Sequence, residues 1–168
     1  ICAYDPAHPK LETREILTDL LVGVVGPTHP FARRRTIAVR ELADQPLILR
    51  EAGSSPRQIV DDMLKRHGVA PPVVMESAST AAIKRFVEEG IGMAILSRQV
   101  VKKELQEGSL HRVLLADAEI AYHFYLIRHK DRWISRALQA FVEMARSFQL
   151  RPEAASRPRR PARRGRGR

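Results

Sequence analysis

Residues 29–97 read HPFARRRTIAVRELADQPLILREAGSSPRQIVDDMLKRHGVAPPVVMESASTAAIKRFVEEGIGMAILS and contain two strand-to-helix units in succession. The runs Leu47–Arg50, Val73–Glu76 and Met93–Leu96 have the length and composition of strands. Segments of roughly ten to fifteen residues with helical periodicity separate them. Such alternation requires right-handed crossovers, which place helices on both faces of a mostly parallel sheet. The sequence therefore predicts an α/β fold.

The first strand-to-helix junction carries strong signals for the start of a helix. Ser55 is the expected N-cap, Pro56 is the expected first helical residue, and Gln58 completes a Ser-x-x-Gln capping box. Gly68 is expected to end this helix in a left-handed conformation. The inward face of the helix is predicted to consist of Ile59, Val60, Met63 and Leu64.

The second junction is also rich in hydroxyl side chains, with Ser77, Ser79 and Thr80 directly before a helical period. Ser, Thr, Asp and Asn are the residue types that begin helices, because their side-chain oxygens accept hydrogen bonds from free backbone N–H groups. The inward face of this second helix is predicted to consist of Ile83, Phe86 and Val87, with Gly90 at its end.

Both junctions are suited to binding a small anion. The first N–H groups of a helix lack intrahelical acceptors and lie at the positive end of the helix dipole. Because the carboxyl ends of neighbouring parallel strands meet at the same edge of a sheet, the two junctions are expected to open toward one crevice. Taken singly, each hydroxyl is more simply interpreted as a helix cap. The prediction of ligand contact concerns the group Ser54, Ser55, Ser77, Ser79 and Thr80.

Further elements are predicted on either side of these junctions. A buried strand is expected at Leu20–Gly26, and residues 1–19, which lack a comparable pattern, are expected to form a loop that approaches it. The other expected elements are a helical turn at Val39–Ala43, a helix of about ten residues from Arg98 that ends at Gly108, strands at Leu110–Leu115 and Ala121–Arg128, and a long helix at Trp133–Leu150.

Composition indicates a cytoplasmic protein of one domain or slightly more. The chain has 168 residues, and its single cysteine, Cys2, can form no internal disulfide, which favours a reducing compartment. Neither an apolar run of membrane-spanning length nor a signal sequence is evident, so we expect a soluble chain without a membrane partner.

The formal net charge of +10 is concentrated at the C-terminal end, where residues 151–168 contain eight arginines against Glu153. This tail has no large apolar side chain to offset the entropy of ordering, so it is predicted to be disordered. Two interpretations stay open. The arginines either neutralise phosphates and bind nucleic acid non-specifically, or form a dispensable extension.

Catalytic and metal-binding patterns are missing from the sequence. The six histidines are scattered, without His-Glu-x-x-His or Cys/His spacing, and no Gly-x-Ser-x-Gly elbow or Walker loop occurs. Gly90-Ile-Gly92 follows a helix and precedes a strand, which is the reverse of the order in a dinucleotide fingerprint. We therefore expect no enzyme activity, metal or cofactor. His29 is better explained by a turn than by ligand contact.

Three segments resemble the effector-binding domain of LysR-type transcriptional regulators. The likeness runs from about Leu17 to Gln149, and its specificity comes from the order and spacing of the motifs. The segments are LLVGVVG with the following Pro27-x-His29-Pro30-Phe31-Ala32, VRELADQPLILRE with Gly53-Ser54 after it, and ESASTAAIKRFVEEGIGMAILS with its Gly90-x-Gly92 turn.

The resemblance implies a type 2 periplasmic-binding-protein fold, in which two α/β lobes are joined by two crossing strands. Residues 20–128 correspond to a complete second lobe with its crossover strands, and residues 1–19 to the remnant of a partial first lobe. Residues 129–150 correspond to a C-terminal helix that packs on the first lobe, before the tail at 151–168. The family's helix-turn-helix has no counterpart here, so DNA contact is expected only through a missing N-terminal domain or weakly through the arginines.

By the same resemblance, a small anionic effector is held partly by Ser77, Ser79 and Thr80, and by Ser54 and Ser55. Its binding would shift the population of lobe orientations in a full-length homo-oligomer and so regulate transcription. The alternatives are a solute-binding protein of the same fold, an enzyme on the same scaffold, and a nucleic-acid binder that acts through its tail. The missing signal sequence argues against the first, and the missing catalytic constellation against the second.

Overall fold

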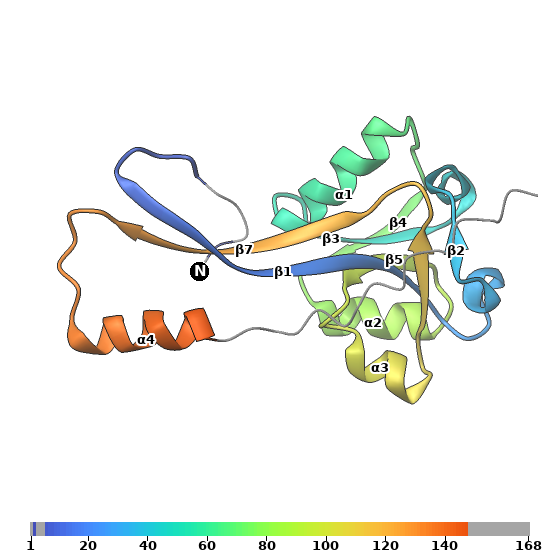
Figure 1. Ribbon diagram of the computed structural model, residues 1–168. Helices are drawn as coiled ribbons and strands as arrows, with labels where there is room; N and C mark the ends of the chain where they lie inside the picture. The colour runs from blue at the N-terminus through green and yellow to red at the C-terminus, as the bar shows by residue number, and fades with distance from the viewer. Residues whose placement is uncertain (1, 3–5, 148–168) are drawn as a thin grey trace, which may run out of the picture.

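Seven strands form one sheet in the order β2-β6-β1-β5-β3-β4, with β7 paired to β1 outside this path (Figure 1). The structure is a computed structural model that describes residue 2 and residues 6–147. The strands are β1 (Leu11–Val25), β2 (Thr36–Ile37), β3 (Leu47–Arg50), β4 (Val73–Ser77), β5 (Met93–Ser97), β6 (His111–Leu115) and β7 (Ile120–His129). The helices are α1 (Ser55–Arg66), α2 (Thr80–Glu88), α3 (Lys102–Glu107) and α4 (Arg136–Ser147), with 3-10 turns η1 (Pro30–Arg33) and η2 (Val39–Asp44).

The predicted α/β sheet is observed, and its strands run in one direction except for β1, so that parallel and antiparallel pairings both occur. The pairs β3–β4, β3–β5 and β2–β6 are parallel. β1 pairs antiparallel with β5, β6 and β7, so within the described residues it alone opposes the common direction. The resulting arrangement places the carboxyl ends of β3, β4 and β5 at the same edge, next to the path of β1 and β7.

Two apolar clusters cover the two faces of the sheet, as the sequence predicted. Alternate residues of β1 point to opposite faces, so that Leu21 and Val25 join one cluster while Val22 and Val24 join the other. The first cluster includes the inward face of α1, and the second includes that of α2. Figure 1 shows α1 on one side of the sheet and α2 and α3 on the other.

The predicted loop at residues 1–19 is wrong for its second half, because β1 begins at Leu11. Residues Leu11–Leu21 pair with β7 in a two-stranded ribbon, with a register shift between Glu15 and Leu17. Most of these side chains are only partly buried or exposed. The strand is therefore specified by its long-range pairing with β7 and not by an apolar alternation that could be read locally.

Most element boundaries agree with the predictions to within a few residues. β3 coincides with its predicted range, and Gly68, Gly90 and Gly108 have the positive φ expected after a helix. The predicted ten-residue helix from Arg98 is shortened to the six residues of α3. The helix predicted at Trp133–Leu150 is observed as α4 from Arg136, and residues 148–150 of that prediction lie outside the described residues. The arginine tail also lies outside them.

The predicted capping box at the start of α1 is not formed. Ser54, rather than Ser55, is the N-cap, and its side chain accepts no capping hydrogen bond. Instead, Ser54 Oγ donates to the carbonyl of Glu51 at 3.0 Å. The amide of Gln58 lies 3.5 Å from the Gly53 carbonyl. The serine hydroxyl is thus used to shape the turn before the helix, which leaves backbone N–H groups of α1 without this side-chain acceptor.

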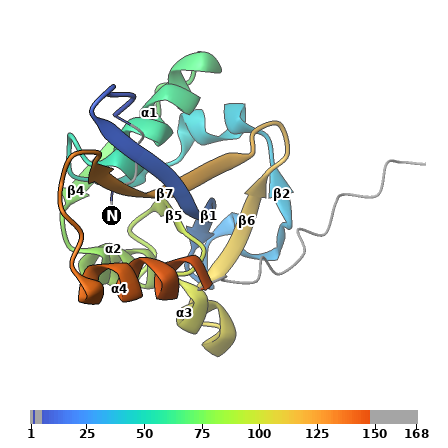
Figure 2. The same ribbon diagram turned by 60° about the vertical axis from the view of Figure 1, so that its left-hand side comes forward.

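α4 carries large apolar side chains that are not covered. Its apolar period includes Leu138, Phe141 and Met144, which are exposed, as is Trp133 just before it. Figure 2 shows the helix below the ribbon formed by β1 and β7, joined to β7 by a long loop. Among the helices of the described residues, none is both long and apolar enough to cross a membrane.

Candidate functional site

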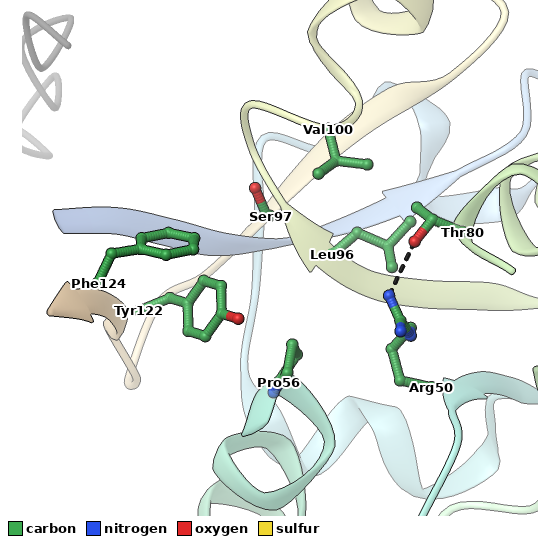
Figure 3. A pocket seen from close by; sticks show the side chains of 8 residues that line it. All are labelled: Arg50, Pro56, Thr80, Leu96, Ser97, Val100, Tyr122 and Phe124. Carbon is green, nitrogen blue, oxygen red and sulfur yellow. Dashed lines mark hydrogen bonds between the residues drawn. The ribbon is translucent and has the colours of Figure 1, made fainter. Parts of the chain in front are cut away.

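A pocket of about 180 Å³ lies where the carboxyl ends of β3 and β5 meet the first turns of α1 and α2 (Figure 3). β7 closes it from the side with two aromatic rings. The crevice predicted from the two junctions is therefore present at this edge of the sheet. Its lining consists of Arg50, Pro56, Thr80, Leu96, Ser97, Val100, Tyr122 and Phe124.

Arg50, the last residue of β3, links the two junctions directly. Its Nη1 donates to Thr80 Oγ1, the first residue of α2, at 2.8 Å. Its Nε and Nη2 bind the two carboxylate oxygens of Glu51 at 2.7 and 2.8 Å. The pairing raises the pKa of Arg50 and lowers the pKa of Glu51 below the ordinary 4.5, so both groups are ionised at neutral pH. The fork of Arg50 is therefore oriented toward the pocket before any ligand arrives.

Arg57, in the first turn of α1, fixes the relative position of three elements. Its guanidinium donates to the Arg50 carbonyl at 2.9 Å, to Glu76 of β4 at 2.7 Å and to Asp61 at 2.9 Å. Burial lowers the pKa of Arg57, but the bonds to Glu76 and Asp61 outweigh burial and the pKa is raised. Since its side chain is only 14% exposed, this charge is used to hold the ends of β3 and β4 together.

The other side of the pocket is formed by β5 and the crossing strand β7. Ser97, at the end of β5, donates its hydroxyl proton to Asp19 of β1. The rings of Tyr122 and Phe124 meet edge to face with centroids 4.7 Å apart. Burial raises the pKa of the Tyr122 phenol, Arg50 lowers it and Asp19 raises it, with a net increase that keeps the phenol protonated at neutral pH. The apolar rings and hydroxyl groups of β5 and β7 thus lie across the pocket from the Arg50 guanidinium.

Of the five predicted ligand-contacting hydroxyls, Thr80 lines the pocket. Ser79 is the N-cap of α2 and accepts from the backbone N–H of Ala82 at 3.2 Å. Ser77 accepts from the N–H of Ser79 at 3.1 Å. Ser54 shapes the turn before α1, and Ser55 begins that helix. The residues of each junction are close in space, but these serines are not among the residues that line the pocket.

The two cap positions give a matched test of their structural role. Ser79→Ala removes the acceptor for the Ala82 N–H and should lower the free energy of unfolding by about 1 kcal/mol. Ser54→Ala removes a hydroxyl that donates to the Glu51 carbonyl but accepts no capping bond, so it leaves the helix N–H groups as they were and should cost less. Urea denaturation of both variants at neutral pH measures the difference. Equal losses would contradict the assignment of Ser79 as the functional cap.

Sequence reasoning did not identify Arg50, Ser97, Tyr122 or Phe124 as site residues. A signal existed for Arg50, since an arginine directly follows the apolar run Leu47–Leu49 at the carboxyl end of a strand. The aromatic residues come from β7, about 70 residues further along the chain than β3, and only the pairing of β7 with β1 places them here.

His29 has the turn role that the sequence favoured. Its Nδ1 accepts from the backbone N–H of Phe31 at 3.1 Å and so caps η1. Burial lowers the pKa of His29, against a smaller opposite effect of Gln45, so the ring is neutral at neutral pH. Among residue 2 and residues 6–147, no group of three His, Cys, Asp or Glu side chains is arranged to hold a metal ion.

Comparison with known proteins identifies relatives over most of the chain. The model of the LysR substrate binding domain family matches residues 1–149. The HTH-type transcriptional regulator YeiE of Escherichia coli K12 is 37% identical over 139 residues, which cover 82% of this chain and 47% of YeiE. The HTH-type transcriptional activator CmpR of Synechocystis is 30% identical over 82% of this chain and 45% of its own length. The chain thus spans about half the length of these relatives.

Solved structures show the same architecture. The regulatory domain of CcmR from Synechocystis, solved in complex with 2-PG, matches with a TM-score of 0.79 and 26% identity over 86% of this chain and 70% of that chain. The effector-binding domain of QuiR, solved in complex with shikimate, has a TM-score of 0.75 at 23% identity over 86% of this chain and 68% of that chain, and supports the fold. These neighbours are effector-binding domains with the type 2 periplasmic-binding-protein-like fold. Together with the match over residues 1–149, the shared fold shows that this chain belongs to the LysR substrate-binding domain family.

Proposed function

We propose that this chain is the effector-sensing part of a LysR-type transcriptional regulator and that it binds a small anionic metabolite in the pocket described above. The observation that carries this proposal is the position of the Arg50 guanidinium, which is held by Glu51 and donates to Thr80 in the first turn of α2. A guanidinium, a threonine hydroxyl and the N-terminus of a nine-residue helix together form a donor set for a carboxylate or phosphate.

The similar CcmR domain was solved with 2-PG, which supports a small-molecule ligand for this site. Glu51 neutralises part of the Arg50 charge, so the anion is expected to bind through hydrogen bonds from the remaining guanidinium N–H groups. Glu51 occupies the Nε/Nη2 edge of the fork, so the Nη1 side is the one that adjoins Thr80. We propose that an effector anion binds on this side, with Thr80 as a direct contact and Ser54, Ser55, Ser77 and Ser79 shaping the two corners.

The proposed arrangement of lobes is that of a ligand sensor. We propose that residues 20–128 form the second lobe with its crossing strands, and that α4 packs its exposed apolar side chains on the first lobe. An effector between the lobes would favour one orientation of the two by its differential affinity. DNA binding would be carried by a helix-turn-helix region of the kind for which the relatives are named, in a cytoplasmic homo-oligomer.

The test is a binding measurement on a hydroxyl that does not cap a helix. Thr80→Val keeps the side-chain shape but removes the hydroxyl, and should weaken the binding of 2-PG or of a small carboxylate about tenfold, the effect of one hydrogen bond to a charged group. Isothermal titration calorimetry gives the affinity, and a thermal melt should show little change in Tm. Thr80→Ser, which retains the hydroxyl, should bind nearly as well as the wild type. If Thr80→Val bound these ligands with the same affinity as the wild type, the proposed site would be refuted.

A further inference from the structure

The two ends of the pocket differ in hydrogen-bonding character. At the end formed by Arg50 and Thr80, both side chains act as hydrogen-bond donors to a ligand. Arg50 can only donate, and Thr80 is expected to donate. An arginine side chain has no acceptor, and Thr80 Oγ1 already accepts from Arg50 Nη1. Within the part of the chain that the structure describes, no acceptor is paired with the Thr80 hydroxyl proton, which is left for a ligand oxygen.

The opposite end is held in an accepting state by a buried carboxylate. Ser97 lines the pocket and gives its single hydroxyl proton to Asp19 Oδ2. Asp19 is 4% exposed, and its Oδ1 accepts from the backbone N–H of Leu20 at 2.7 Å. If Ser97 turned its proton toward a ligand, Asp19 would lose a donor in a buried position, which is costly. Ser97 therefore offers a ligand its oxygen lone pairs and not its proton.

Mostly apolar surface lies between these two ends, with the Tyr122 hydroxyl as a further polar group. Leu96 and Val100 face the rings of Phe124 and Tyr122 across the pocket (Figure 3). Such surface contributes affinity for a hydrocarbon body but does not orient it, whereas the two polar ends define a direction. A ligand that matches all three parts carries an acid group at one end and a donor at the other.

We propose that the effector is a small carboxylate that also carries a hydrogen-bond donor, either a hydroxyl or an ammonium group, and that Ser97, oriented by Asp19, selects for this donor. Asp19 is here a positioning residue, because it acts through Ser97 and does not touch the ligand. The inference rests on the proposed function, since the acid group of the ligand is placed at Arg50 and Thr80.

The test uses four probes with one carbon skeleton: cyclohexanecarboxylate and its 3-hydroxy, 3-amino and 3-methoxy derivatives. The first has no second polar group, the next two carry a neutral and a cationic donor, and the last carries only an acceptor. Affinities for the full 168-residue chain are measured by titration followed by NMR. The hydroxy or amino probe should bind about tenfold more tightly than the methoxy probe. The better of the two identifies whether the donor is a hydroxyl or an ammonium group.

Two variants then show whether Asp19 and Ser97 produce the preference. Asp19→Asn offers Ser97 an amide donor, so Ser97 can release its proton to the ligand. The preference for the donor probes over the methoxy probe should fall to within about twofold, and unsubstituted cyclohexanecarboxylate serves as the reference for any general loss of affinity. A merely structural role of Asp19 would weaken all four probes alike. Ser97→Ala should remove the preference in the same way, and carries the test if Asp19→Asn does not fold.

The possible failures separate this inference from the proposed function. If all carboxylates bind with equal affinity and lose it in Thr80→Val, the anion site stands and the selection by Ser97 is overturned. If the methoxy probe binds best, the assigned polarity is overturned. If none of the four probes binds, this ligand class is excluded, while the proposed anion site is judged separately by 2-PG and Thr80→Val.

Discussion

Arg50→Gln is expected to weaken the binding of a small carboxylate to the pocket by about 100-fold, roughly 3 kcal/mol, which is the upper range for a charge-assisted hydrogen bond. Glutamine retains an amide donor, but its side chain is two atoms shorter and has neither the charge nor the fork. Arg50 contacts Thr80 as well as Glu51, so its loss also frees the threonine side chain. Isothermal titration calorimetry with the best-binding carboxylate measures the effect.

Lysine at the same position is the matched control. Arg50→Lys keeps the positive charge but cannot bind Glu51 through two parallel bonds, so it should recover part of the lost affinity and not all of it. The Glu51 partner is 40% exposed, and a pair of this kind contributes little to stability, so both variants should melt near the wild type. Undiminished carboxylate binding by Arg50→Gln would show that the anion is held elsewhere.

The pH dependence of this binding should come from the ligand. Arg50 has a raised pKa and stays charged throughout. The pKa of Glu51 is lowered from 4.5, chiefly by the hydrogen bond from Arg50. Glu51 is therefore ionised at every pH above 4.5. Between pH 5 and 8 neither partner therefore changes its charge, and affinity should follow the ionisation of the ligand acid alone.

The sequence was sufficient to predict the elements whose signals are local. The apolar runs of β3, β4 and β5 and the glycines after α1 and α2 specify strand, helix and turn through neighbours a few residues away. The meeting of two junctions at one edge follows from the parallel pairing of β3 with β4. These local rules predicted the edge at which the pocket lies.

Features that depend on distant pairing were not predictable. The Leu11–Leu20 half of β1 has polar residues on both sides and is a strand because β7 lies against it. That same pairing brings Tyr122 and Phe124 to the pocket, and the pairing of β1 with β5 places Asp19 next to Ser97. Hydroxyl residues at a helix start can bind a ligand or cap the helix, and only the folded structure shows that Thr80 faces the pocket while Ser79 caps α2.

Gly92→Ala is expected to produce a large loss of stability, about 3 kcal/mol in the free energy of unfolding. A Cβ atom at Gly92 would lie 2.4 Å from the Pro46 carbonyl oxygen and 3.2 Å from its carbon. That carbonyl cannot easily move, because it accepts from the N–H of Met93 at 2.9 Å where β3 and β5 begin to pair. The two strands must separate at this point, and Leu47 and Met93, both fully buried, must lose contacts.

Gly53→Ala is the control, because Gly53 has a φ of +87° but nothing within 4 Å of an added Cβ. It should cost only the backbone strain of about 1 kcal/mol. Urea denaturation of both variants compares a steric conflict with conformational strain. The separation of β3 from β5 in Gly92→Ala should also alter the pocket, since Arg50 and Ser97 lie at the far ends of these two strands. Folded Gly92→Ala protein should therefore bind carboxylates more weakly than Gly53→Ala, and an equal loss of stability in the two variants would refute the close strand contact.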